Sequence, residues 1–501
     1  MSLSLRLLIA ASVLSLAIAP TPAIAQMNMP GMKMPMKAKP AVAKKRAAKK
    51  AARKKAKPAR PATVREAPVA RKPMTMPMPS PAAPPAPDMK HMDMGTAAPA
   101  AGAMAMPASD HGAHEMAMTG ALGPYPMERE SSGTAWQPDS SEHLGLMTMS
   151  GGWTLMAHGV VNLTYDHQSG PRGADMAFPS GMLMGMARRP VGNGTLQLRA
   201  SISPDPIMGR RGYPLLLASG ETADGVRPLV DRQHPHDFFM ELSASVSQNI
   251  GRNGSLFLYA GLPGEPAFGP PAFMHREAIA DSPEAPISHH WLDSTHISFG
   301  VVTAGLTFGR TKIEVSRFNG REPDQHRWNI EAGALDSTTV RLSWNPTAEL
   351  ALQGSWGRFK NPEQLEPGVD QERLSASLLY AREIAPGWKL AGTLAWGRKI
   401  VEHHKDDAFA AEASLKHAGW TLFGRGEITE NRELVEAVEH GPAFRVGKLS
   451  LGAVRDFPLA KHVSLGAGGL LSVNFVPDAL ASSYGGHNPA GAMGFVRLRL
   501  N

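Results

Sequence analysis

The sequence predicts an all-β protein: a transmembrane antiparallel β-barrel of roughly 14 to 18 strands, preceded by a disordered tail rich in Met, Lys, Ala and Pro. Three observations predict this class. The chain starts with an export signal, its later part alternates apolar and polar residues in short segments, and no apolar run after the signal reaches the ~20 residues of a spanning helix. An inner-membrane helical protein is therefore not expected.

Residues 1–25 have the features of a secretory signal peptide. Arg6 precedes the apolar run LLIAASVLSLAIA, and the small-residue cleavage signature Ala23-Ile24-Ala25 stands before Gln26. We expect the mature chain to begin at Gln26. The 501 residues include no cysteine, so an exported chain forms no disulfides and any soft metal ligand has to be a methionine thioether.

Residues 26–120 differ in composition from the rest of the chain. Between Met27 and Gly120 there are 17 Lys and Arg against 5 Asp and Glu, whereas the chain outside this tail and the signal peptide has 34 against 39. The tail contains few apolar residues larger than Ala and Met, so it buries too little apolar surface to offset the entropy of ordering. We predict a disordered tail, a linker over residues 121–150 and a barrel over residues 151–501.

The tail holds 15 of the 28 methionines, in clusters that also contain His and Asp. Thioethers suit Cu(I) or Ag(I), and imidazole with carboxylate also holds Cu(II). Ligands on a disordered chain lose entropy when they bind, so such sites suit capture and hand-over, for example to periplasmic copper proteins. The alternative is a flexible spacer that binds nothing. The candidate copper ligands are Met27, Met29, Met32, Met34, Met36, Met89, His91, Met92, Met94, His111, His114, Met116 and Met118.

A Lys-rich block, KAKPAVAKKRAAKKAARKKAKPARP, lies within the tail. It is similar to the basic tails of linker histones, but export argues against a nucleic-acid partner. Lipopolysaccharide or other anionic envelope polymers are the polyanions that an exported chain meets. A solvated spacer without a partner explains the block equally well.

After residue 151 the alternation has a period of two. Near the end of the chain Val496, Leu498 and Leu500 face one way while Arg497 and Arg499 face the other, which predicts a polar lumen. A soluble sandwich also alternates. The export signal, the abundant glycine and the strand repetition through to the last residue favour the barrel.

Several longer stretches carry a family resemblance, among them GPYPMERESSGTAWQPDSSEHLGLM, RRGYPLLLASGETADGVRPLVDRQHPHDFFMELS and PAFMHREAIADSPEAPISHHWLDSTHISFGVVTAG. From Gly123 onward the chain resembles a poorly characterised family of Gram-negative outer-membrane β-barrel proteins. The resemblance implies a cell outer membrane location, with outer-membrane lipids as partners. A Met/His-rich tail before a barrel also resembles the layout of the copper resistance protein B family. The chain departs from many outer-membrane proteins at Asn501, where they end in an aromatic residue.

Histidine concentrates in two segments of the barrel region. DRQHPHDFF contains His234, His236 and Asp237, and a second segment supplies further imidazoles. Imidazole with carboxylate is an ordinary ligand set for Cu(II) or Zn(II). The alternative is a hydrogen-bonded plug or loop that shapes the lumen. The candidate ligands of the second segment are His275, His289, His290 and His296.

An enzymatic function is not expected. Asp293, Ser294 and His296 lie within four positions, but neighbours on a strand point to opposite faces and do not form a hydrolytic triad. The polar run SRFNGREPDQHR, residues 316–327, is of the kind that constricts a pore, and a solvated loop explains it equally well.

These observations predict an outer-membrane barrel protein of copper handling or resistance, in which a periplasmic tail captures copper ions for sequestration or passage. The alternative is a porin-like channel for another small solute, with the basic tail as a spacer or envelope anchor. A third class, attachment to anionic envelope polymers through the Lys-rich block, depends on charge alone.

Overall fold

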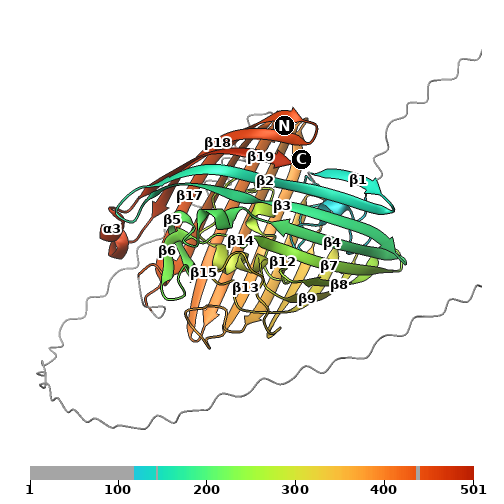
Figure 1. Ribbon diagram of the computed structural model, residues 1–501, viewed down its shortest axis with the longest axis horizontal. Helices are drawn as coiled ribbons and strands as arrows, with labels where there is room; N and C mark the ends of the chain where they lie inside the picture. The colour runs from blue at the N-terminus through green and yellow to red at the C-terminus, as the bar shows by residue number, and fades with distance from the viewer. Residues whose placement is uncertain (1–117, 143–144, 436–440, 501) are drawn as a thin grey trace, which may run out of the picture. The chain divides into compact units, whose positions relative to one another are not determined.

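The computed structural model describes residues 118–142, 145–435 and 441–500. In this part of the chain one sheet of 17 strands contains an antiparallel barrel, which closes where the last strand pairs with β2 (Figure 1). The extra strand, β1 (Leu146–Ser150), forms a hairpin with β2, so sixteen strands make the barrel. The predicted fold class and strand number are confirmed.

Each barrel strand pairs with the barrel strands before and after it in the chain. The strands are β2 Trp153–Gln168, β3 Asp175–Val191, β4 Gly194–Ile202, β7 Phe239–Ile250, β8 Gly254–Gly261, β9 Val301–Phe308, β10 Thr311–Phe318, β11 Ser337–Trp344, β12 Leu350–Phe359, β13 Gln371–Ala385, β14 Trp388–Val401, β15 His404–His417, β16 Trp420–Asn431, β17 Phe444–Ala460, β18 Val463–Phe475 and β19 Ala490–Leu500.

Shorter elements lie in the connections. A separate hairpin pairs β5 (Tyr213–Thr222) with β6 (Pro228–Gln233). The helical turns are η1 Met127–Arg129, η2 Asp205–Met208, η3 Phe273–His275, α2 His289–Leu292, η4 Ser294–His296 and α3 Asp478–Tyr484. No helix in the described ranges is long and apolar enough to cross a membrane.

Side chains alternate between an apolar outer face and a polar lumen. In β10, Ile313 and Val315 are exposed on the outside, whereas Lys312 and Glu314 are buried inside. The period of two in the sequence has the same cause, because successive strand residues point to opposite faces of the sheet. The inward direction predicted for Arg497 is confirmed, since its side chain is buried and paired with Asp281.

The two ends of the barrel differ. One, the short-turn end, carries connections such as residues 251–253, 309–310 and 386–387, together with the end of β19. The other, the long-loop end, carries residues 203–238, 262–300 and 319–336. Exposed aromatic residues mark the outer face near both ends, as in barrels with aromatic girdles at the membrane interfaces. They include Phe308, Trp344, Trp388 and Trp420 near the short-turn end and Tyr165, Trp356, Phe409 and Phe475 nearer the long-loop end.

The described part of the N-terminal segment, residues 118–142, lies inside the barrel near the short-turn end. The hydroxyl of Ser247 on β7 donates a hydrogen bond of 2.7 Å to the carbonyl of Ala121. Further along the segment, the carbonyl of Gln137 accepts a hydrogen bond from the side chain of Asn345, which follows β11. Residues predicted as a linker therefore form, as far as residue 142, a plug across the lumen.

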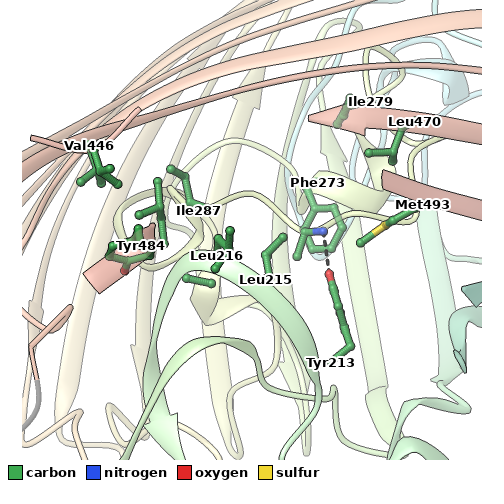
Figure 2. Packing of buried hydrophobic residues seen from close by; sticks show 14 of the residues in the cluster. Tyr213, Leu215, Leu216, Phe273, Ile279, Ile287, Val446, Leu470, Tyr484 and Met493 are labelled. Atoms are coloured by element: carbon green, nitrogen blue, oxygen red, sulfur yellow. Dashed lines mark hydrogen bonds between the residues drawn. The ribbon is translucent and has the colours of Figure 1, made fainter. Parts of the chain in front are cut away.

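The connections 203–238 and 262–300 fold inward from the long-loop end and share a buried apolar cluster with the wall. Leu215 and Leu216 of β5 lie among Phe273 and Ile287 of the second connection, close to wall residues of β17 to β19 (Figure 2). The backbone N–H of Ala285 donates to the Tyr213 hydroxyl, so a hydrogen bond also joins the two connections. In this conformation the packing anchors both connections inside the lumen.

Candidate functional site: a buried histidine cluster

Five imidazoles from the two inward-folded connections come together in the lumen. We call them the histidine cluster: His234, His236, His289, His290 and His296. Ring centroids lie 5.1 Å apart for His236 and His296, 5.2 Å for His289 and His296, and 5.6 Å for His234 and His290. The two histidine-rich segments of the sequence thus converge. Pro235 separates His234 from His236. The ring of His234 contacts His290, and the ring of His236 contacts His296.

Every Nδ1 atom of the cluster faces an acceptor. His236 pairs with Asp205 and His289 with Asp293, each at 2.8 Å. His296 Nδ1 donates to the backbone carbonyl of Asp293 at 2.7 Å. The two remaining rings have looser partners: His234 Nδ1 lies 3.4 Å from Glu221 and His290 Nδ1 lies 3.7 Å from Glu322.

The other ring nitrogen is unused. In the described residues the Nε2 atoms of all five imidazoles are buried and have no hydrogen-bond partner in the protein. An Nδ1–H held by a carboxylate or carbonyl leaves Nε2 as the basic nitrogen, which is the arrangement that orients histidine ligands around metal ions. The cluster therefore holds five Nε2 atoms that no other group of the described residues engages.

The spacing of the rings also suits coordination. Two imidazoles that bind one ion through nitrogen at about 2.0 Å with a tetrahedral angle have ring centroids about 5 Å apart. As they stand, however, no three His, Asp or Glu side chains within the described ranges are positioned to hold one ion. The cluster provides the donors of a metal site, and side-chain rotations would have to complete the geometry.

Burial and neighbouring charges set the protonation of the cluster. Burial lowers the pKa of His234 and His296 well below the ordinary value. The other imidazoles act in the same direction on both rings, and Arg327 does so on His234. Burial also lowers the pKa of His289, against the opposing effect of Asp293. For His290 the charge of Glu322 outweighs burial and raises the pKa. Most of the cluster is therefore neutral and able to donate electron pairs at neutral pH.

Acidic and basic groups surround the cluster. Arg327 pairs with Glu221 and, at 3.1 Å, with Asp237. Burial raises the pKa of Asp237 to about 6, although Arg327 opposes this. Of the polar run predicted to constrict a pore, Glu322 and Arg327 are buried here, whereas His326 and Arg317 are exposed.

The serine near the cluster lacks a catalytic base. Ser294 Oγ donates to Glu322 at 3.4 Å and accepts from Arg373 at 3.1 Å, while His296 engages the backbone of Asp293. This geometry does not align a nucleophile with a base and an orienting group. That the protein is not an enzyme stays a prediction.

The other predicted ligands lie elsewhere. His275 is outside the cluster, and its ring centroid lies 6.0 Å from that of His158 on β2. The backbone carbonyl of Met118 accepts a hydrogen bond from Met127 N–H. The remaining tail candidates fall outside the described residues: Met27, Met29, Met32, Met34, Met36, Met89, His91, Met92, Met94, His111, His114 and Met116.

Sequence reasoning missed two kinds of residue. Asp205 and Glu221 orient imidazoles of the cluster, but no local signal distinguishes them from other acidic loop residues. Met182, Met184 and Met186 follow a visible signal, since M-x-M-x-M on a strand places three thioethers on one face. Together with His158 they line a cavity outside the histidine cluster.

Fold and site define a closed, membrane-type β-barrel with an occupied lumen. No family model and no curated protein sequence matches the chain. Among solved structures it is similar to the Salmonella typhi OmpF complex with daunomycin (TM-score 0.46, 11% identity, 71% of this chain and 100% of that one). It is also similar to an anion-selective porin from Comamonas acidovorans (0.41, 13%, 70% and 100%) and to the outer-membrane channel DcaP of Acinetobacter baumannii (0.39, 9%, 72% and 100%).

Proposed function

We propose that the protein is a porin-like outer-membrane barrel that passes a small solute when its plug and inward-folded connections rearrange. The observation that carries the proposal is the closed barrel with an apolar outer face and charged residues on its inner wall. A lumen lined by charged side chains serves a polar solute, because lipid surrounds only the outer face. In the described conformation residues 118–142 cross this lumen, so passage requires a second conformation.

Conductance across a planar lipid bilayer tests this function. The chain has no cysteine, so an introduced pair is selective: Ala121→Cys on the plug with Ser247→Cys on β7, whose hydroxyl donates to the Ala121 carbonyl. We expect the wild type to show intermittent openings, the oxidised pair to be silent, and reductant to restore the openings. Each single-cysteine variant is the control. Equal conductance of the oxidised and reduced pair would contradict a moving plug.

A second candidate is copper handling, favoured by the five unengaged Nε2 atoms of the histidine cluster. Under this candidate the tail captures copper and the histidine cluster accepts Cu(II) inside the barrel. Imidazole nitrogen is an ordinary Cu(II) ligand, and the carboxylates at Nδ1 strengthen the basicity of Nε2. Under this candidate the tail lies in the periplasm, because it precedes the first strand of a barrel whose short turns face that side.

Cu(II) binding to the full-length protein tests this second candidate. We expect the variant His289→Phe with His296→Phe to lose at least one equivalent of bound Cu(II), together with its visible absorption band. The exposed ring of His326 provides the control, so His326→Phe should bind as the wild type does. Unchanged binding in the double variant would contradict a role of the histidine cluster in copper handling.

The tail is tested separately, by titrating Cu(I) and Ag(I) into the peptide of residues 26–120 with its methionines intact or changed to Leu.

A further inference from the structure

A second group of soft donors lines the inner wall where β2 and β3 pair. Met156 stands directly opposite Met186, and His158 opposite Met184, in the register of the two strands. His158 Nε2 lies 3.3 Å from the Met184 sulfur. Because these residues alternate with outward-facing ones, all of them project toward the lumen.

The inward-folded parts of the chain cover this wall. Met274 and His275 of η3 face it from one side, and Met127 of η1 belongs to the plug. Between them lies a cavity of about 160 Å³. We call it the methionine cavity, after the six methionines that line it: Met127, Met156, Met182, Met184, Met186 and Met274.

Packing alone does not account for this composition. Only 12 methionines follow residue 118, and six of them line this one cavity. On the outer face of the same two strands the chain uses Leu155, Leu163 and Leu183, where only apolar surface is needed. An interior filled for packing is close to crystal density, whereas this space holds several molecules the size of water.

The methionine and histidine side chains of the cavity are its soft or neutral donors. Charged residues of both signs also line it: Glu130, Glu142, Glu277, Arg188, Arg199, Lys416 and Arg499. Thioether sulfur is a neutral ligand that suits Cu(I) and Ag(I) and is a poor ligand for Mg²⁺ or Ca²⁺. His158 and His275 add two imidazole rings to the lining, and imidazole nitrogen is also a ligand for copper. The carboxylate of Glu142, which also lines the cavity, is engaged by Lys389 and Lys416.

We propose that the methionine cavity binds a soft monovalent metal ion, Cu(I) or Ag(I), through thioether sulfurs and an imidazole nitrogen. The site is distinct from the histidine cluster in position and in the class of ion it selects. It does not depend on the passage function, because an ion that binds here need not cross the barrel. Conductance measures passage, and the experiment below measures only binding.

Ag(I), which does not change oxidation state, is the probe for the full-length protein in detergent. The cavity variant carries Met156→Leu, Met184→Leu and Met186→Leu, which conserve volume and therefore packing. The control variant carries three changes outside the cavity: Met147→Leu, Met149→Leu and Met208→Leu. The tail contributes equally to all three proteins, so differences between them report on the barrel.

Two measurements decide the proposal. A ligand that binds the folded barrel raises its unfolding temperature. We expect Ag(I) to raise it in the wild type and the control variant but not in the cavity variant, and equilibrium dialysis to show one fewer tightly bound Ag(I) in the cavity variant. The proposal is overturned if the cavity variant is stabilised as much as the control, or if Ag(I) stabilises none of the three proteins. A cavity variant that fails to fold is replaced by Met184→Leu alone, judged by the same criteria.

Discussion

Charged residues inside the lumen are held by specific partners. Arg276 is fully buried and makes a two-point contact with Glu412 of β15, at 2.7 and 2.8 Å. Its remaining nitrogen contacts Asp293, which in turn holds His289. One arginine therefore links the barrel wall to the histidine cluster, and its loss would leave two buried carboxylates without their ion-pair partner.

Replacing Arg276 with Met should destabilise the barrel by about 3–5 kcal/mol, the usual effect of breaking a buried ion pair. Urea unfolding in detergent, followed by tryptophan fluorescence, measures the change. Arg358→Met is the matched control, because the Arg358 side chain is largely exposed and contacts Asp370 at 3.4 Å. Its loss should cost less than about 1 kcal/mol. Similar effects of the two changes would contradict the assigned role of Arg276.

The stability of the folded barrel should depend on pH because of Asp281, which lies in the connection between β8 and β9. Burial alone would raise its pKa, but the charges of Lys416, Arg499 and Arg497 outweigh burial and hold the pKa well below its ordinary value. A depressed pKa contributes stability above the unfolded-state value of about 3.9, and this contribution declines as pH falls further.

The urea midpoint of the wild type should therefore fall between pH 5 and pH 2.5 more steeply than that of Asp281→Asn. At pH 6 the variant should be the less stable protein, since Arg497 and Arg499 lose a charged partner. The gap should narrow as the solution becomes acidic. A gap of constant size over this range would show that Asp281 is not ionised in the folded barrel.

At the level of elements, the strands and the inward-folded connections were predictable to different degrees. Each strand meets lipid on one face and the lumen on the other, so its sequence alternates and β10 or β19 can be found without tertiary information. The hairpin of β5 and β6 lies inside the lumen and packs against both the wall and the other connection. Its run Leu215, Leu216 and Leu217 is buried on all sides, and a continuous apolar run does not say what covers it.

The hairpin should depend on this apolar contact. Leu216→Asp places a charge in the apolar cluster of Figure 2 and should release the connection 203–238. Trypsin would then cut folded protein in detergent at the exposed residues Arg210 and Arg211 faster than it cuts the wild type. Ile207→Asp is the control, because Ile207 is exposed in the same connection. Equal cleavage of the two variants would contradict a hairpin anchored by Leu216.

The residues of the candidate site could be predicted from the sequence, but their arrangement in space could not. The sequence identified His234, His236 and His289 as candidate ligands because histidine is concentrated around them. Their convergence requires two connections to enter the same lumen, which one sequence does not reveal. The plug was missed for a similar reason: residues 118–142 have no periodic pattern and bind the wall largely through backbone carbonyls, as at Ala121 and Gln137.

At the scale of the whole molecule, the two ends of the barrel predict its orientation. Membrane barrels place short turns and chain ends toward the periplasm and long loops toward the exterior. The structure has β1 and the end of β19 at the short-turn end, and both histidine-bearing connections start from the long-loop end. The histidine cluster would then be reached from outside the cell, and the plug from the periplasm.

An epitope tag tests this orientation at two matched positions. Gly368 lies at the long-loop end and Gly387 at the short-turn end, and both are exposed glycines with positive φ in connections between strands. In intact cells an antibody should label a tag inserted at residue 368 and not one at residue 387, whereas permeabilised cells should show both. The opposite pattern would reverse the orientation of the barrel and place the histidine cluster on the periplasmic side.

Labelling at neither position, even after permeabilisation, would show that these connections do not tolerate insertion. The tag at residue 368 is then replaced by one at residue 224, which is exposed in the turn between β5 and β6.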